Sequence, residues 1–306
     1  MNERLARAIH SLQGLSCGDA FGERFFLHPE VARSLIAQKA LPSPPWRFTD
    51  DTAMAIAITE ILKEFGEIHP ERLAENFGRA FLADPHRGYG PAMHSLLPEL
   101  ASHPARWKDL SQQLFKGTGS FGNGAAMRVA PIGAFFANDL DAVVKQAHLS
   151  AQVTHSHHEG AAGAIAVAVA AALACRHKTA SFTPGDFLQI IRDHTPDSEV
   201  QHRIDHAITL ADNATVESAV AALGNGAQVS AQDTVPFSLW AAARHLDSYE
   251  DALWTTVSGL GDRDTTCAIV AGIVVMSSGV ESIPPAWVEA REPLPAWFLH
   301  SDPEGL

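Results

Sequence analysis

The segment that decides the fold is Gly160-Ala-Ala-Gly-Ala-Ile-Ala-Val-Ala-Val-Ala-Ala-Ala-Leu-Ala-Cys175, the longest apolar run in the chain. No charged residue interrupts it, so it predicts a helix that is apolar on nearly every side and lies at the centre of the molecule. Its alanine side chains would let neighbouring helices approach closely. The run falls short of the ~18 residues that indicate a membrane-spanning helix. We therefore expect a buried helix and no membrane span.

Helical periodicity continues on both sides of this segment. Apolar residues three and four positions apart predict one buried stripe on an N-terminal helix: Leu5, Ile9, Leu12 and Leu15. Further helices are expected over residues 52–65, over residues 70–81, where Pro70 suits the first turn, and from Thr265 through Val274.

Strand signals are weak, because the chain has two tyrosines and few runs in which polar and β-branched residues alternate. Loops are expected over residues 41–47, which contain three prolines, and over the glycine-rich residues 117–124. The proline-punctuated tail after Ser282 is expected to wrap the surface. No linker or shift in composition marks a second domain, so we predict a single all-α domain over residues 1–306.

The composition limits the classes of function. With 22 Lys and Arg against 35 Asp and Glu, the formal net charge is −13, which disfavours attraction to the phosphate backbone of nucleic acid. A hydrophobic content of 46% indicates a folded soluble protein. The three cysteines (Cys17, Cys175 and Cys267) are widely spaced and odd in number, which favours buried thiols in a reducing compartment. No secretory signal is visible, so we expect a cytoplasmic protein.

Two short acidic segments stand directly before apolar helices. The first is Thr49-Asp50-Asp51-Thr52, and the second is Asp262-Arg263-Asp264-Thr265. N-capping alone would explain one such segment, since Asp and Thr accept hydrogen bonds from the free amides of a helix start. A cap needs one side-chain oxygen, however, and each segment supplies a pair of carboxylates and a threonine. The two segments together are therefore a candidate site.

Carboxylates that converge would repel one another unless a cation neutralised them. The candidate ligands are hard oxygen donors, which suit Mg²⁺, Mn²⁺ or Ca²⁺ better than Zn²⁺: Thr49, Asp50, Asp51, Asp262, Asp264 and Thr265. A pair of divalent ions would balance the four carboxylates, and such a centre could orient a water and lower its pKa. The segments lie about 210 residues apart, so only the fold decides whether they meet.

A glycine-rich loop, Gly117-Thr-Gly-Ser-Phe-Gly-Asn-Gly124, contains the spacing G-x-G-x-x-G. It is not a dinucleotide-binding fingerprint, because the residues before it are polar and helix-like and no βαβ unit surrounds it. It is either a flexible turn or a cradle in which backbone amides approach a pyrophosphate. Phe121 in this loop either packs against the protein or stacks on a base.

The segment Thr154-His-Ser-His-His-Glu159 does not match the zinc motif H-E-x-x-H, because residue 162 is alanine. We expect its histidines to be solvated or to cap the following helix, and one of them could belong to a site. The polar loop of Arg87, Gly88 and Tyr89 carries no assignment.

Taken together and in order, these segments resemble the ADP-ribosylglycohydrolase family, which includes the dinitrogen-reductase-activating glycohydrolases. Each motif is weak alone, and the ordered set is specific. The matching motifs span residues 18–265: Gly18-Asp-Ala-Phe-Gly22, Phe48-Thr-Asp-Asp-Thr52, Gly119-Ser-Phe-Gly-Asn-Gly-Ala-Ala-Met-Arg128, Thr154-His-Ser-His157 and Gly261-Asp-Arg-Asp-Thr265.

The resemblance implies a compact orthogonal helix bundle that holds a pair of Mg²⁺ or Mn²⁺ ions. The reaction would be hydrolysis of the bond between the anomeric carbon of ADP-ribose and an acceptor. By matching position, the implied metal ligands are Thr49, Asp50, Asp51, Asp262, Asp264 and Thr265. The implied ADP-ribose contacts are Ser120, Gly122, Asn123, Gly124 and His155, with Phe121 near the adenine. The candidates for the base that takes the proton of the attacking water are Asp50 and Asp264.

Two positions depart from the family pattern. Many relatives carry a glutamate seven residues after the aspartate of the first motif, where this chain has Phe26. Glu23 is the nearby acid that could replace it as a metal ligand. Arg263 stands where relatives usually have a small residue, and its guanidinium could pair with a carboxylate or with a substrate phosphate.

Two other interpretations remain open. A two-metal phosphoesterase acting on a nucleotide would release phosphate or a mononucleotide. A non-catalytic ADP-ribose-binding protein, like the lens crystallins that resemble this family, would bind without turnover, although both acidic segments are retained. The expected partner is an ADP-ribosylated protein or a small molecule that contains ADP-ribose, with arginine, serine and O-acetyl linkages all open. The negative charge disfavours modified nucleic acid, and nothing indicates a coiled coil or an exposed apolar stripe, so we expect a monomer.

Overall fold

The computed structural model describes residues 2–210 and 214–298. Within those residues the chain forms seventeen α-helices, four short 3₁₀-helices and, apart from two isolated β-bridges, no strand. The prediction of an all-α protein is confirmed. In the same part of the chain, no helix combines the length and apolar content that crossing a membrane requires.

Most helices follow one another through connections of a few residues, and the connections from α2 to α3 and from α4 to α5 are longer. The first half contains α1 Glu3–Glu23, α2 Pro29–Ala37, α3 Asp50–Phe65, α4 Pro70–Ala83, α5 Met93–Ser102, η1 Pro104–Arg106, α6 Trp107–Gly117, η2 Asn123–Ala125, α7 Ala130–Phe135 and α8 Leu140–Gln152. The second half contains α9 His158–Ala174, α10 His177–Ala180, α11 Pro184–His194, α12 Glu199–Thr209, α13 Val216–Leu223, α14 Ala231–Arg244, α15 Tyr249–Ser258, α16 Arg263–Ser278, η3 Val280–Ser282, α17 Pro285–Ala290 and η4 Ala296–Phe298.

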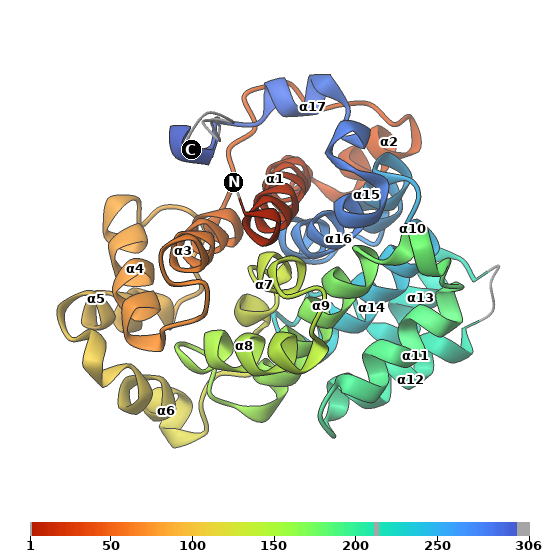
Figure 1. Cartoon of the computed structure of the whole chain (residues 1–306). Helices are drawn as coiled ribbons and strands as arrows, with labels where there is room; N and C mark the ends of the chain where they lie inside the picture. The colour runs from red at the N-terminus through yellow and green to blue at the C-terminus, as the bar shows by residue number, and fades with distance from the viewer. Residues whose placement is uncertain (1, 211–213, 299–306) are drawn as a thin grey trace.

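The centre of the molecule consists of α1, α9, α14 and α16. Every residue of α9 after His158 is buried, so the alanine-rich segment is the central helix that its composition predicts. Figure 1 shows α3 to α6 on one side of this centre and α11 to α13 on the other. The core helices therefore fix how the outer helices, and the loops between them, lie relative to one another.

Helices α1 and α16 pack against each other closely, because a stripe of glycines on α1 leaves room for the backbone of α16. Gly14, Gly18 and Gly22 stand four residues apart and face α16. A Cβ atom on Gly18 would overlap with Ala271, and one on Gly22 would overlap with the backbone carbonyl of Arg263. Only glycine permits this contact, which places the C-terminal turn of α1 beside the first turn of α16.

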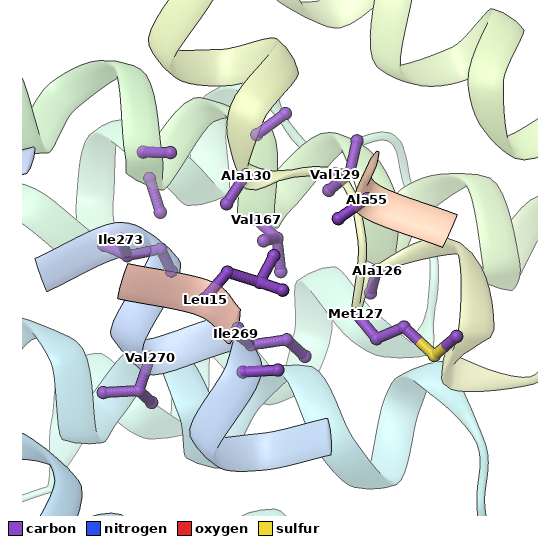
Figure 2. Close-up of a cluster of buried hydrophobic side chains, with 14 of the residues drawn as sticks. Leu15, Ala55, Ala126, Met127, Val129, Ala130, Val167, Ile269, Val270 and Ile273 are labelled. Atoms are coloured by element: carbon purple, nitrogen blue, oxygen red, sulfur yellow. The ribbon is translucent and has the colours of Figure 1, made fainter. Parts of the chain in front are cut away.

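Apolar side chains also pack where α1 meets α16. Figure 2 shows Leu15 of α1 among Ile269 and Ile273 of α16, Val167 of α9 and Ala130 of α7. All five side chains are buried. Truncating a leucine in such a position typically costs about 2–5 kcal/mol, because the cavity does not fully collapse.

The C-terminal segment differs from expectation. Its described part does not simply wrap the surface, because Trp287 of α17 is buried and its ring stacks on Phe21 at a centroid distance of 4.4 Å. Trp46 and Trp254 complete this aromatic cluster. The prolines of the segment limit its helix to one short piece, while the large apolar area of the indole drives its burial.

Candidate functional site

The two acidic segments meet at one pocket. Thr49 is the N-cap of α3, and Asp262 is the N-cap of α16. Both helix starts open onto a pocket of about 340 Å³. Its wall includes ten of the residues singled out in the sequence: Asp50, Ser120, Phe121, Gly122, Asn123, Gly124, His155, Asp262, Asp264 and Thr265.

Three other predicted residues lie outside the pocket wall. Thr49 and Asp51 are buried behind it, where Thr49 Oγ1 lies 3.0 Å from Asp51 Oδ2. Glu23 is the last residue of α1, and its side chain is partly enclosed. This enclosure raises the pKa of Glu23, and the negative charges of Asp19 and Asp262 raise it further. Glu23 therefore lies close enough to Asp19 and to Asp262, at the start of α16, for their charges to act on it.

The aspartates of the site are wholly or partly enclosed by the protein, Asp50 and Asp51 most of all, and they repel one another. Burial, followed by the negative charge of Asp19, raises the pKa of Asp50 to about 8. The pKa of Asp51 and that of Asp264 also rise well above the usual range, first because of burial and then because of neighbouring carboxylates. Since the charges of Asp262 and Asp264 act on Asp51 across about 210 residues of sequence, the segments share one electrostatic environment.

Asp19 is a buried acid whose role the sequence did not reveal. Its carboxylate accepts hydrogen bonds from the backbone amides of Thr49 and Thr52 at 3.0 and 3.1 Å, and from both threonine hydroxyls. Burial raises the pKa of Asp19 to about 6, against the opposing effect of these hydrogen bonds. Asp19 therefore ties the start of α3 to α1. The signal in the sequence that could have marked it is an aspartate among small and apolar residues inside the first family-like motif.

Two further loops shape the pocket and received no role from the sequence. The backbone amide of Asp50 donates to the carbonyl of Arg87 at 2.7 Å, and Gly88, with a φ of +89°, lines the pocket. On the opposite side, Gln228 and Val229 line the pocket. The loop that carries them is tied to α16, because the amide of Asp262 donates to a carbonyl of this loop, that of Asn225, at 3.1 Å.

The glycine loop lies against His155. A Cβ atom on Gly122 would lie 3.2 Å from His155 Nε2, and one on Gly124 would lie 3.1 Å from the same atom. Any larger residue at these positions would displace the imidazole or close the pocket. Phe121 makes an edge contact with the ring of His157 at a centroid distance of 5.5 Å, and it stays 43% exposed at the pocket wall, where the exposed part of its ring can meet a ligand.

The histidines before α9 have different environments. The ring of His157 accepts a hydrogen bond from the amide of Glu159 at 3.2 Å, so the prediction of a capping histidine is confirmed for His157. His155 is buried in the pocket wall. Burial and the nearby positive charge of Arg128 lower the pKa of His155 to about 3, so its imidazole is neutral at physiological pH.

The side chain of Arg263 contacts Phe25 and Phe26 and, within the described residues, does not pair with a carboxylate. Its Nη1 donates to the carbonyl of Phe25 at 3.0 Å, and its guanidinium lies 5.0 Å from the ring centroid of Phe26. Across the described ranges, it makes no ion pair with a carboxylate. The two residues that depart from the family pattern therefore contact each other. Of the two alternatives for Arg263, pairing with a carboxylate is wrong, and pairing with a substrate phosphate stays a prediction.

As the side chains stand, no group of three or more His, Cys, Asp or Glu within residues 2–210 and 214–298 is arranged to hold a metal ion. The acidic side chains are near enough to perturb one another, while binding an ion would require them to turn toward it.

Comparison with known proteins gives the same family as the sequence motifs. A sequence model of the ADP-ribosylglycohydrolase family matches residues 1–301. A human protein named ADP-ribosylhydrolase ARH3 is 29% identical over 94% of this chain and 90% of its own. An uncharacterized protein of Archaeoglobus fulgidus is 33% identical over 90% of this chain and 88% of its own.

The fold has a solved counterpart. A structure described as an ADP-ribosylglycohydrolase-related protein complex superimposes with a TM-score of 0.67 and 21% identity, covering 95% of this chain and 94% of the other. At this identity the likeness concerns the fold, whereas the family match extends over nearly the whole sequence. The chain belongs to the ADP-ribosylglycohydrolase family, whose activity is hydrolysis of glycosidic bonds of ADP-ribose.

Proposed function

We propose that this protein is a metal-dependent hydrolase that releases ADP-ribose from an acceptor. One observation carries the proposal: two acidic helix starts, about 210 residues apart in sequence, share a pocket with a glycine loop and a buried histidine. The acids supply a site for hydrolysis, and the loop supplies a site for a pyrophosphate.

The donor set fits divalent cations. Asp51 Oδ1 and Asp264 Oδ1 are buried and, in the part of the chain that the structure describes, have no hydrogen-bond partner. Buried carboxylates that repel one another and leave oxygens unpaired are stabilised by a hard cation. The proposed ligands of a pair of Mg²⁺ or Mn²⁺ ions are Thr49, Asp50, Asp51, Asp262, Asp264 and Thr265. Bound there, the ions would lower the pKa of a water and neutralise the acids.

Glu23 is proposed as a further ligand in place of the family glutamate. It follows Asp19 by four residues on α1, so both side chains project from the same face of the helix. The effect of Asp262 on its pKa supports this position. Phe26 cannot serve, because it carries no oxygen and lies against Arg263.

The other half of the pocket would bind the sugar nucleotide. The backbone of residues 120–124 approaches the pocket without large side chains, except for Phe121, whose exposed ring offers a face for adenine. His155 adds a ring nitrogen beside Gly122 and Gly124. These groups orient ADP-ribose so that its anomeric carbon faces the aspartates.

The aspartates would then assist the attack of water on the anomeric carbon. Glycoside cleavage passes through a positively charged, oxocarbenium-like state, which an acidic pocket stabilises. Asp50 and Asp264 line the pocket and are the proposed acceptors of the proton of that water. Without a cation Asp50 would keep its own proton near neutral pH, so deprotonated Asp50 and a bound cation favour each other.

The test is a panel of peptides and small molecules that carry ADP-ribose through arginine, serine or O-acetyl linkages, with the products identified by mass spectrometry. We expect intact ADP-ribose to be released from at least one linkage in the presence of Mg²⁺ or Mn²⁺. Chelation and the substitutions Asp50→Ala and Asp264→Ala should each abolish release. Undiminished release after all three treatments would refute the proposal.

The products separate the alternatives. Phosphate or a mononucleotide would indicate a phosphoesterase. Calorimetric binding of ADP-ribose without turnover of any linkage would indicate a non-catalytic relative.

A further inference from the structure

Arg128 is a fully buried cation that the proposed reaction does not use. Its side chain has no exposed area, and although the charge of Asp50 acts on it, Arg128 makes no direct ion pair among the described residues. The guanidinium lies 4.3 Å from the ring centroid of Phe77, and Nη1 contacts the sulfur of Met54 at 3.4 Å. A buried guanidinium that makes no direct ion pair is costly, so we look for a role in the hydrogen bonds that it makes.

The role is indicated by the partner of Arg128 Nη2. This nitrogen donates to Thr154 Oγ1 at 2.8 Å, and Thr154 Oγ1 lies 2.7 Å from His155 Nδ1. Guanidinium groups only donate, so this bond uses a lone pair of the hydroxyl and leaves its hydrogen to point elsewhere. Within the described residues, His155 Nδ1 is the acceptor that the Thr154 hydroxyl hydrogen can reach.

Burial makes the direction of the second bond definite. Thr154 has no exposed area, so a hydroxyl hydrogen without an acceptor would carry the full cost of desolvation. Thr154 therefore donates to Nδ1. Since a neutral imidazole carries one hydrogen, that hydrogen lies on Nε2, the nitrogen that faces Gly122 and Gly124.

We propose that Arg128 and Thr154 are positioning residues that hold His155 as the Nε2–H tautomer, a fixed hydrogen-bond donor aimed into the glycine loop. An acceptor oxygen on the ligand, such as a phosphate or ribose oxygen, is the group that this donor recognises. The arrangement also excludes His155 as the base of the reaction, because the nitrogen facing the pocket already carries its hydrogen. The identity of the ligand as ADP-ribose rests on the proposed function, whereas the tautomer is a property of the protein without ligand.

A matched pair of substitutions tests the relay. Thr154→Val keeps the shape of the side chain and removes the hydroxyl, while Thr154→Ser keeps the hydroxyl. The tautomer is read from the ¹⁵N chemical shifts of ¹⁵N-histidine-labelled protein without ligand, with the His155 signals assigned by their loss in His155→Gln. We expect Nε2–H in the unaltered protein and in Thr154→Ser, and a shift toward Nδ1–H in Thr154→Val.

Binding of ADP-ribose, measured by calorimetry, is the second readout. Thr154→Val should weaken it about tenfold, and Thr154→Ser should restore it, because one hydrogen bond to a charged or polar ligand is at stake.

Arg128→Met should give mixed tautomers; if this variant does not fold, the Thr154 pair still decides. An Nδ1–H tautomer in the unaltered protein, or unchanged His155 signals in Thr154→Val, would overturn the proposal. Failure of the unaltered protein to bind ADP-ribose would instead count against the proposed function, with the tautomer still measurable.

Discussion

Asn123 Nδ2 donates to Asp262 Oδ2 at 2.7 Å, which joins the glycine loop directly to the second acidic helix start. The same amide nitrogen also donates to Thr234 Oγ1 at 3.0 Å, so α14 holds it in place. The loop proposed to bind the nucleotide and an aspartate proposed to bind a cation therefore cannot move independently.

This bond predicts a combined loss when Asn123 is changed. Asn123→Ala should leave the partly buried Asp262 carboxylate without the Asn123 donor, at a typical cost of about 1 kcal/mol, and should weaken ADP-ribose and Mg²⁺ binding about tenfold or more. Asn76→Ala is the matched control, because Asn76 Nδ2 also donates to a carboxylate, that of Glu60, at 3.3 Å outside the pocket. Calorimetry on both variants decides, and equal affinities would contradict the coupling.

Asp19 should matter for stability before it matters for catalysis. In Asp19→Asn, an amide group replaces one carboxylate oxygen that now accepts from Thr49 or Thr52, so a donor faces a buried donor. We expect the free energy of unfolding in urea to fall by about 1–3 kcal/mol. Asp139→Asn is the control: Asp139 caps the exposed start of α8, where Asn caps equally well, so a change of a few tenths is expected. Similar losses in both variants would show that Asp19 is only a cap.

The glycine loop should not tolerate a methyl group. In Gly124→Ala the new Cβ atom would lie 2.9 Å from His155 Cε1, so the imidazole or the loop has to shift. We expect ADP-ribose binding to weaken at least about tenfold, with a stability loss of about 1–3 kcal/mol from overpacking. Gly185→Ala, in the first turn of α11 where the nearest atom lies at 3.9 Å, should leave both quantities unchanged or raise stability slightly. Normal binding by Gly124→Ala would place the ligand elsewhere.

The acidic site predicts an unusual pH dependence of stability without cations. Asp50 keeps its proton in the folded state up to about pH 8, whereas in the unfolded state it loses its proton near its ordinary pKa of 3.8. Stability is therefore lost as pH rises through this window, by about 1.4 kcal/mol per pH unit for each such group. The depressed pKa of His155 acts in the opposite sense, but only between about 3 and 6.5.

Urea unfolding in chelator between pH 6.5 and 8 isolates the aspartate effect. We expect the free energy of unfolding to fall over this range and the slope to flatten in Asp50→Asn. A rising or flat profile in the unaltered protein would mean that the acids are not held near one another.

Divalent cations should reverse this loss. Because an ion competes with protons for the carboxylates, Mg²⁺ at millimolar concentration should raise Tm more at pH 8 than at pH 6.5. The effect should disappear in the double variant Asp50→Asn with Asp264→Asn. Glu217→Gln, on the far surface helix α13, is the control for non-specific ion binding and should keep the full effect. Equal shifts in all three proteins would contradict a cation site at these helix starts.

The sequence predicted the helical fold and the chemistry of the parts. Periodicity located α1, α3, α4, α9 and α16 within a few residues, because the spacing of apolar side chains is a local property. The acids and the glycine loop were recognisable for the same reason. The oxygen donors of an aspartate and the backbone freedom of a glycine depend on residue type alone. The start of α3 was missed by two residues, because the acidic cap belongs to the helix that follows it.

Other features could not be found by local pattern. Asp19 gains its role from Thr49 and Thr52, which another helix brings to it. Arg263 turned toward Phe25 and Phe26, although its neighbours in sequence are aspartates. In both cases the partner is set by packing rather than by position in the chain.

By itself, the sequence determined which helices form, which side chains could bind a cation and which loop could approach a phosphate. Tertiary structure alone decided that the two acidic helix starts face one pocket, and that Arg128 reaches His155 through Thr154. The physical reason is that the distance between remote segments depends on how closely helices pack. Here Gly18 and Gly22 let the end of α1 lie beside the start of α16, while Asp19 on the same helix binds the start of α3.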